Sequence, residues 1–206
     1  MLPPQKIDIW VIALAEIPAS QDFEMLSADE QERAACFRHA RERERFLATR
    51  VALRKIAGDL LGLAPAAVQF RRDPNAKPQI ANATAAPWHF NLALADGILA
   101  IAFTRSGPIG IDLERVDPDV DLRELSARFV LPRAGEITPR QHFQDWVARE
   151  AMGKCSGRGF ASIVRPENFA VHYFEPAPDF VGCLATAATS DSALIFHDAL
   201  PAERAR

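Results

Sequence analysis

The sequence predicts an α+β fold of two similar halves, a pseudo-dimer packed as one compact unit with a cleft between the halves. One observation is the order of the expected elements, which runs strand, helix, hairpin and then strand, helix and strands again. A second is the Gly107-Pro108 pair, which separates these two series. We therefore expect an N-terminal half over residues 1–105 and a C-terminal half over residues 106–206.

Composition is typical of a globular protein. The chain has 206 residues, of which 49% are hydrophobic and 25% charged, and this balance excludes wholesale disorder. The formal net charge of −3 argues against a nucleic-acid-binding protein, because such proteins need excess positive charge to displace counterions. A local basic patch for a small phosphorylated ligand is compatible with that charge.

Cysteine usage and the N-terminus predict a cytoplasmic protein. The three cysteines are widely spaced and odd in number, which is not typical of a secreted disulfide framework. Asp8 and Glu16 interrupt the first apolar run, so we do not interpret it as a signal peptide. No segment approaches the roughly 18 apolar residues of a membrane span. Two halves that form one cleft need no partner subunit, so we expect a monomer with no membrane contact.

In the N-terminal half, residues 7–14 form an apolar run typical of a buried strand. Ser27 and Glu30 make a capping box before a helical region expected through residues 28–62, with a possible interruption. Gly62 ends this region, because glycine commonly follows the last turn of a helix.

The middle of that helical region, residues 38–55, is rich in arginine. One interpretation is a solvated face with salt-bridge pairs three or four residues apart. A second interpretation is that these arginines contact an anionic ligand, and a third is that they form a nucleic-acid-binding helix. The interleaved Glu42 and Glu44, with the net negative charge, argue against nucleic acid.

Further strands and helices follow. Residues 90–94 and 98–103 flank Asp96-Gly97, a dipeptide that strongly indicates a hairpin, and residues 73–75 form a turn. In the C-terminal half the elements expected before the final short strands are a strand and two helices, at residues 109–113, 121–131 and 139–156.

Two carboxylates share one face of the strand that begins at Ile109. Residues two apart on a strand point the same way, so Asp112 and Glu114 project together while Ile111 and Leu113 face the core. Carboxylates this close repel one another unless something positive lies between them. Magnesium would satisfy them, since it accepts one or two carboxylates with phosphate oxygens and water. The alternative is a solvent-facing strand end.

A third carboxylate lies on the inward face of the helix at residues 139–156. Phe143 and Trp146 belong to an apolar stripe whose next turn carries Glu150. A charge there is costly unless it is paired or metal-bound. Lys154 lies one turn further on, so the alternative is an ordinary Glu150–Lys154 surface pair.

A basic loop completes the chemistry-bearing residues. It begins at Arg71-Arg72 and ends at Lys77-Pro78, where the proline biases Lys77 toward an extended conformation. The loop could contact a phosphate, but taken alone it is interpreted as solvated.

In this order, these elements resemble the surfactin-synthetase-activating (Sfp-like) class of 4′-phosphopantetheinyl transferases. That family has a Gly-Lys-Pro-like loop, a Phe-Asn-[Ile/Leu]-Ser-His-Ser strand, a Gly-Ile-Asp-[Ile/Leu]-Glu strand and a Trp-x-x-[Lys/Arg]-Glu-Ala-x-x-Lys helix. The matching segments are residues 76–78, 90–95, 110–114 and 146–154. Spacing and residue identity both agree, and the last two motifs together are specific.

The resemblance implies magnesium-dependent transfer of 4′-phosphopantetheine from coenzyme A to a serine of an acyl or peptidyl carrier protein. It implies that Asp112, Glu114 and Glu150 hold magnesium against the coenzyme A diphosphate, with Glu114 at the position that varies in the family. Glu150 would also help to deprotonate the incoming serine. Lys154 would neutralise or protonate the departing 3′,5′-ADP.

The same resemblance implies that Arg33, Arg72 and Lys77 are the cations near the nucleotide phosphates. Coenzyme A would then lie in the cleft between the halves. The carrier protein would dock beside it, with an acidic helix against the arginines of residues 38–55.

One segment departs from the family pattern. Residues 93–95 read Ala-Leu-Ala, where the family has Ser-His-Ser side chains that normally contact coenzyme A phosphates. Losing those contacts would cost about 1–3 kcal/mol. His89 lies on the opposite strand face from Leu94 and is expected to play a structural part. Weaker coenzyme A binding is one hypothesis, and a catalytically silent relative that binds coenzyme A or a carrier as a regulator is the alternative.

Overall fold

A computed structural model describes residues 5–17, 22–72, 78–120, 137–157, 166–187 and 192–201 of the chain. Three predicted features lie outside the described residues: the turn at 73–75, Lys77 and the helix at 121–131.

The described elements follow the predicted order closely. The strands are β1 (Gln5–Ala13), β2 (Phe70–Arg72), β3 (Pro78–Ile80), β4 (His89–Ala95), β5 (Ile98–Thr104), β6 (Ile109–Arg115), β7 (Phe169–Phe174), β8 (Phe180–Ala187) and β9 (Ser192–His197). The α-helices are α1 (Ala28–Ala35), α2 (Ala40–Leu61) and α4 (Pro139–Ser156). Short 3₁₀ turns span Leu14–Glu16, Phe23–Met25, Pro65–Ala67 and Pro166–Asn168.

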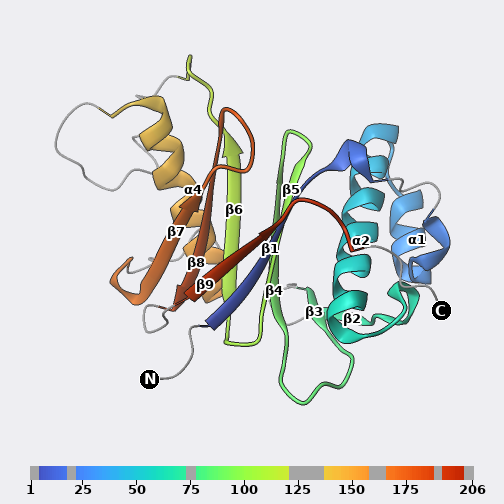
Figure 1. The fold of residues 1–206 in the computed structure, drawn as a ribbon. Coiled ribbons are helices and arrows are strands. Elements are labelled where there is room, and N and C mark those ends of the chain that lie inside the picture. The colour runs from blue at the N-terminus through green and yellow to red at the C-terminus, as the bar shows by residue number, and fades with distance from the viewer. Residues whose placement is uncertain are drawn as a thin grey trace.

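The α+β fold is confirmed, and its elements form four layers (Figure 1). A four-stranded sheet in the order β4-β5-β1-β9 packs face to face with a three-stranded sheet in the order β6-β8-β7. Helices α1 and α2 lie outside the first sheet, and α4 lies outside the second. The small β2–β3 hairpin lies near the end of α2.

Each interface between layers has its own apolar core because strand residues alternate between faces. On β4, Phe90 and Leu92 pack toward α2, whereas Ala93 packs toward the second sheet. On β6, Ile111 and Leu113 enter the core between the sheets, as predicted. The opposite face of β6 is left for α4 and for the acidic residues.

Local signals account for the ends of the helices and the hairpin. In the capping box, Glu30 N donates to Ser27 Oγ at 3.4 Å and Ser27 N to Glu30 Oε2 at 3.0 Å. Gly62 caps α2 in the left-handed conformation with φ 68°. Asp96 and Gly97 have φ values of 44° and 84°, both positive as a two-residue hairpin turn of type I′ requires.

The last described strand returns to the first sheet. β9 pairs parallel to β1, and His197 Nε2 lies 2.9 Å from Asp8 Oδ1. The His197 ring also stacks on Trp10, with 4.4 Å between centroids. Strands before the predicted boundary near residue 105 belong to the first sheet or to the β2–β3 hairpin, and β6, β7 and β8 after it form the second sheet. β9 is the exception, because it follows the boundary but joins the first sheet. The division into two similar halves stays a prediction.

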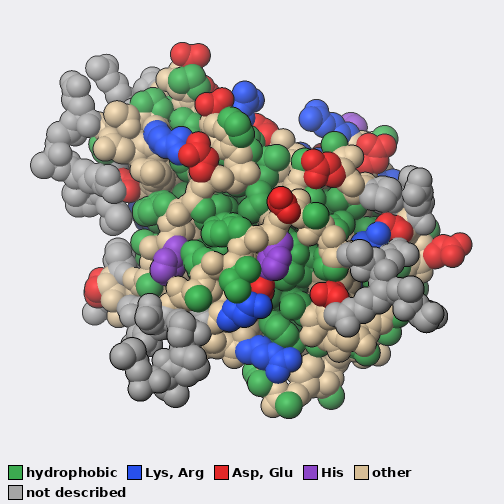
Figure 2. Space-filling model, viewed as in Figure 1, with side chains coloured by type: hydrophobic (Ala, Val, Ile, Leu, Met, Phe, Trp, Pro, Cys, Tyr) green, Lys and Arg blue, Asp and Glu red, His purple; other side chains and the backbone are tan. Residues whose placement is uncertain are grey.

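The edge where β7 and β9 meet carries exposed apolar side chains. Figure 2 shows hydrophobic side chains gathered over the strands in the middle of this face. Tyr173 and Phe196 are 46% and 49% exposed, and the Phe174 and Phe196 rings lie 5.6 Å apart.

None of the described helices has both the length and the apolar character required to cross a membrane. Cys36, Cys155 and Cys183 are all free, and only Cys36 is exposed.

Candidate active site

Gly110 brings helix α4 against strand β6. A Cβ atom at Gly110 would overlap the carbonyl oxygen of Ala151 and lie 2.5 Å from Cys155 N, so any larger residue would push the helix away. This close approach is a backbone requirement of the kind that only glycine meets. It brings the last turns of α4, with Glu150 and Lys154, next to the β6 residue Asp112.

Asp112 and Lys154 form a direct ion pair beneath α4. Lys154 Nζ lies 2.8 Å from Asp112 Oδ1 and donates a second hydrogen bond to Ile111 O at 3.1 Å. Asp112 is only 7% exposed, which argues against the alternative of a solvent-facing strand end. Among the described residues its other oxygen, Oδ2, is buried and has no hydrogen-bond partner. A buried acceptor of this kind is costly unless a ligand satisfies it.

The three predicted carboxylates influence one another. Burial raises the pKa of Asp112 against the opposing effect of Lys154. Burial, followed by the negative charge of Asp112, raises the pKa of Glu114 to about 7. The same two causes, in the same order, raise the pKa of Glu150. Lys154 offsets part of each shift, so the cluster holds more negative charge than its cation compensates.

The carboxylates of Asp112, Glu114 and Glu150 suit a hard cation, but they do not form a complete coordination sphere for one. Among the residues that the structure describes, no group of three or more His, Cys, Asp or Glu side chains is arranged to hold a metal ion. After burial, the negative charge of Asp112 contributes to the raised pKa of both Glu114 and Glu150. Carboxylate oxygens are the ligands that a hard divalent cation prefers, and Asp112 Oδ2 is a spare one. Phosphate oxygens and water would complete such a site.

A cavity of about 580 Å³ lies beside this cluster. Its walls come from the β2–β3 hairpin and the start of β4 on one side, and from the start of β6 and the end of α4 on the other. Its lining includes Arg71, Trp88, His89, Pro108, Cys155 and Gly157. None of the four side chains of the cluster is among the lining residues, but the cavity reaches the last turn of α4, where Cys155 follows Lys154.

A second cavity, of about 710 Å³, lies on the other side of the β2–β3 hairpin. Arg71, Pro78 and Ala81 line both cavities, so the two are neighbours. The second is rich in cations and aromatic rings, including Arg33 and Phe46.

Comparison with known proteins identifies the family. The family model described as the N-terminal part of 4′-phosphopantetheinyl transferase matches residues 16–104. Over 184 residues the chain is 34% identical to the 4′-phosphopantetheinyl transferase HetI of Nostoc, which covers 84% of this chain and 77% of HetI. The chain belongs to the 4′-phosphopantetheinyl transferase family. It is also 22% identical over 194 residues to a phosphopantetheinyl transferase of Thraustochytrium, covering 82% of this chain and 67% of that protein.

For this transferase, the structure brings together four of the predicted site residues. Asp112, Glu114, Glu150 and Lys154 form the cluster beneath α4. Arg33 lies elsewhere, in the second cavity, where its guanidinium carbon is 5.5 Å from the centre of the Phe46 ring. Arg72 belongs to β2, but its side chain, like all of Lys77, lies outside the described part of the chain.

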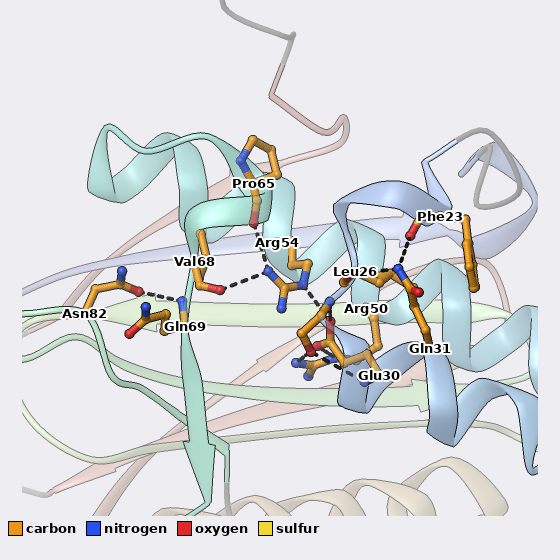
Figure 3. A network of polar contacts seen from close by, with 11 residues as sticks. Phe23, Leu26, Glu30, Gln31, Arg50, Arg54, Pro65, Val68, Gln69 and Asn82 are labelled. Atoms are coloured by element: carbon orange, nitrogen blue, oxygen red, sulfur yellow. Dashed lines mark hydrogen bonds and ion pairs between the residues drawn. The ribbon is translucent and has the colours of Figure 1, made fainter.

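Beside Arg33, a buried network holds α1, α2 and the start of β2 together (Figure 3). Both oxygens of Glu30 are bonded, Oε1 to Arg50 and Oε2 to Arg54 Nε at 2.7 Å. Arg54 Nη1 also donates to Pro65 O and Val68 O, at 3.0 and 2.9 Å. These arginines are therefore engaged in structure, unlike the exposed Arg33.

The segment that departs from the family pattern contributes no polar group. Leu94 packs against the core beneath α2, and Ala93, 4% exposed, packs between the sheets. His89 lines the 580 Å³ cavity, and burial lowers its pKa, while the structural part expected of it stays a prediction. The alternation of β4 places His89 on the same face as the residues that point toward the second sheet.

Proposed function

We propose that this transferase belongs to the Sfp-like class and moves 4′-phosphopantetheine from coenzyme A to a serine of an acyl or peptidyl carrier protein, with magnesium as cofactor. The observation that carries the proposal is the Asp112–Lys154 pair, with Glu114 and Glu150 beside it and a cavity alongside. Phosphoryl transfer needs positioning and charge neutralisation more than covalent chemistry, and this cluster offers both.

In this proposal Asp112, Glu114 and Glu150 hold the magnesium ion, and the unbonded Oδ2 of Asp112 supports that assignment. When bound, magnesium would supply positive charge that lowers the cost of negative charge on the leaving oxygen. Glu150 accepts the proton of the incoming serine, directly or through water, and its raised pKa suits a base near neutral pH. Lys154 neutralises or protonates the departing 3′,5′-ADP.

The nucleotide end of coenzyme A would meet the cations around the β2–β3 hairpin. Arg33 lines the second cavity and Arg71 lines both cavities, which supports a path for a phosphorylated ligand across the hairpin. Arg72 and Lys77 complete this set in the proposal. Arginine suits the purpose because its planar guanidinium can bind a phosphate through two hydrogen bonds.

The carrier protein would present an acidic helix to the start of α2. The side chains of Arg38, Arg41, Arg43 and Arg45 are all exposed there. Charge complementarity of this kind speeds association and selects the partner. We place the reaction in the cytoplasm, with the protein acting as a monomer.

A second candidate function is a regulator that binds coenzyme A or a carrier protein without transferring the arm. The packing of Ala93 and Leu94 into apolar cores favours it, since neither side chain can bond a phosphate. The assembled carboxylates and Lys154 favour the enzyme, because a pure binder needs no such cluster.

Mass spectrometry of an apo carrier protein, incubated with the transferase, coenzyme A and magnesium, separates the two. We expect a gain of one phosphopantetheine mass and none when a chelator replaces magnesium. Lys154→Ala should slow transfer at least about 100-fold. Lys6→Ala, which breaks the Lys6–Asp8 pair on β1 of the first sheet, should not. No transfer to any of several carriers would leave the regulator as the better account.

A further inference from the structure

A side-chain hydrogen bond joins the two sheets next to the acidic cluster. Ile111 N donates to Asn91 Oδ1 at 3.0 Å, so a residue of β4 bonds the backbone of β6. The two strands belong to different sheets. Asn91 thus satisfies the Ile111 N–H, a group that is costly to leave unbonded when it is buried.

The peptide groups around Ile111 are held at both ends. Asn91 accepts from its N–H, and Lys154 Nζ donates to its carbonyl oxygen at 3.1 Å. The same ammonium lies 2.8 Å from Oδ1 of Asp112, the next residue. The first sheet, β6 and α4 therefore meet in one chain of contacts that runs from Asn91 to Asp112.

Apolar packing cannot replace this bond. The Ile111 side chain is fully buried between the sheets, but hydrophobic contact is non-directional and tolerates sliding of one sheet along the other. A hydrogen bond is directional and weakens steeply when its geometry is lost. Asn91 is suited to this part because its strand neighbour Ala93 packs on the same, inter-sheet face, so its amide also points toward β6.

We infer that Asn91 is a positioning residue, which fixes β6 along the first sheet and so sets the Asp112 carboxylate against Lys154. Its effect on transfer rests on the proposed function, whereas its hold on Ile111 does not. Without Asn91, Asp112 keeps its charge and its bond to Lys154, but the position of β6, and with it that of the Asp112 carboxylate, is no longer fixed.

The test compares three variants of the full chain. Asn91→Leu removes the acceptor at similar volume, and Asn91→Asp keeps an acceptor oxygen. Ile9→Val thins the same inter-sheet core without touching the bond. Should Asn91→Leu fail to fold, the smaller Asn91→Ala takes its place. For each we would measure kcat, KM for coenzyme A, thermal stability and hydrogen exchange of the Ile111 amide.

We expect Asn91→Leu to lower kcat about 10- to 100-fold with KM changed less than about threefold, since a small misplacement of catalytic groups costs that much. Asn91→Asp should recover most of kcat. The Ile111 amide should exchange faster in Asn91→Leu, and not in Asn91→Asp or Ile9→Val.

Equal kcat in Asn91→Leu and Ile9→Val would overturn the positioning role, and unchanged Ile111 exchange would overturn the bond itself. If the unmodified chain transfers nothing, the proposed function fails and the catalytic half of this inference fails with it. The exchange of Ile111 would still decide whether Asn91 holds β6.

Discussion

Two buried carboxylates in this chain, Glu30 and Asp112, have opposite ionisation behaviour although they are equally hidden. Glu30 is 8% exposed and Asp112 7%. Glu30 lies between Arg50 and Arg54, which bond both of its oxygens. Asp112 is bonded by Lys154 through one oxygen, and its other oxygen has no hydrogen-bond partner among the described residues.

The difference appears in their pKa values. Burial would raise the pKa of Glu30, but its two arginines outweigh burial and hold the pKa below its usual value. At Asp112 burial prevails over Lys154, so the pKa is raised. A buried acid with all of its partners in the chain holds the fold together. In the proposed function, a buried acid with too little positive charge around it is suited to bind a cation.

The largest effect should come from Asp112→Asn, which keeps the shape and removes the charge. We expect kcat for phosphopantetheine transfer to fall about 1,000-fold, because charge neutralisation is the main contribution to phosphoryl transfer. Asp8→Asn is the control, since Asp8 is a buried carboxylate, 5% exposed, in another part of the fold. Thermal stability of Asp112→Asn should be retained. A kcat within tenfold of the unmodified chain would contradict the role of Asp112.

Glu30→Gln should reverse that pattern, with a loss of stability and little change in kcat. Removing one partner of a buried ion-pair network leaves the arginines uncompensated and costs about 3–5 kcal/mol in the free energy of unfolding. Urea unfolding measures it, and Asp29→Asn, at an exposed neighbour, is the matched control. A stable Glu30→Gln protein with much lower kcat would assign Glu30 to the chemistry instead.

Gly110→Ala tests the contact that assembles the site. The new methyl group would collide with the backbone of α4, which cannot rotate away, so we expect a loss of about 3 kcal/mol and a slower transfer. Gly182→Ala is the comparison on the same sheet, because its methyl would meet the Phe174 ring at 2.5 Å. A side chain can move, so its cost should be smaller. Equal unfolding free energies for the two variants would argue against a tight α4–β6 contact.

The smallest effect should appear in the pH dependence of stability. The pKa of Glu114 is raised from 4.5 to about 7, so between these values the folded chain holds a proton that the unfolded chain has released. Its contribution to stability therefore falls as pH rises from 4.5 to 7. Glu30 has the opposite sign, because its lowered pKa makes its contribution fall as pH falls below 4.5.

Bound magnesium should reduce the electrostatic repulsion between ionised Glu114 and Asp112. We expect magnesium to raise the melting temperature by about 2–4 °C at pH 8 and by less at pH 6, where protons compete for the carboxylates. Scanning calorimetry with and without a chelator measures it, and Glu114→Gln should reduce the difference between the two pH values. A larger shift at pH 6 would count against a carboxylate-bound cation.

Local features were predictable because they depend on near neighbours in the chain. The capping box of Ser27 and Glu30, the hairpin turn at Asp96-Gly97 and the shared face of Asp112 and Glu114 each follow from residues at most three apart. The family motifs also linked Asp112 to Glu150 and Lys154, which lie about 40 residues further along the chain. They did not reveal that His89 lines a cavity, because a strand pattern tells which face a residue takes but not what lies opposite.

The sequence by itself determined most of the described helices and strands, the apolar face of β6 and the shared face of Asp112 and Glu114. Only the tertiary structure decided that Lys154 pairs with Asp112 across 42 residues, that Asn91 bonds Ile111, and that β9 returns to β1. The physical reason is that periodicity and caps arise from contacts within a few residues. Pairings between sheets and helices depend on how whole apolar faces pack. Gly110 allows α4 to approach β6 closely because it has no Cβ atom to collide with the helix backbone.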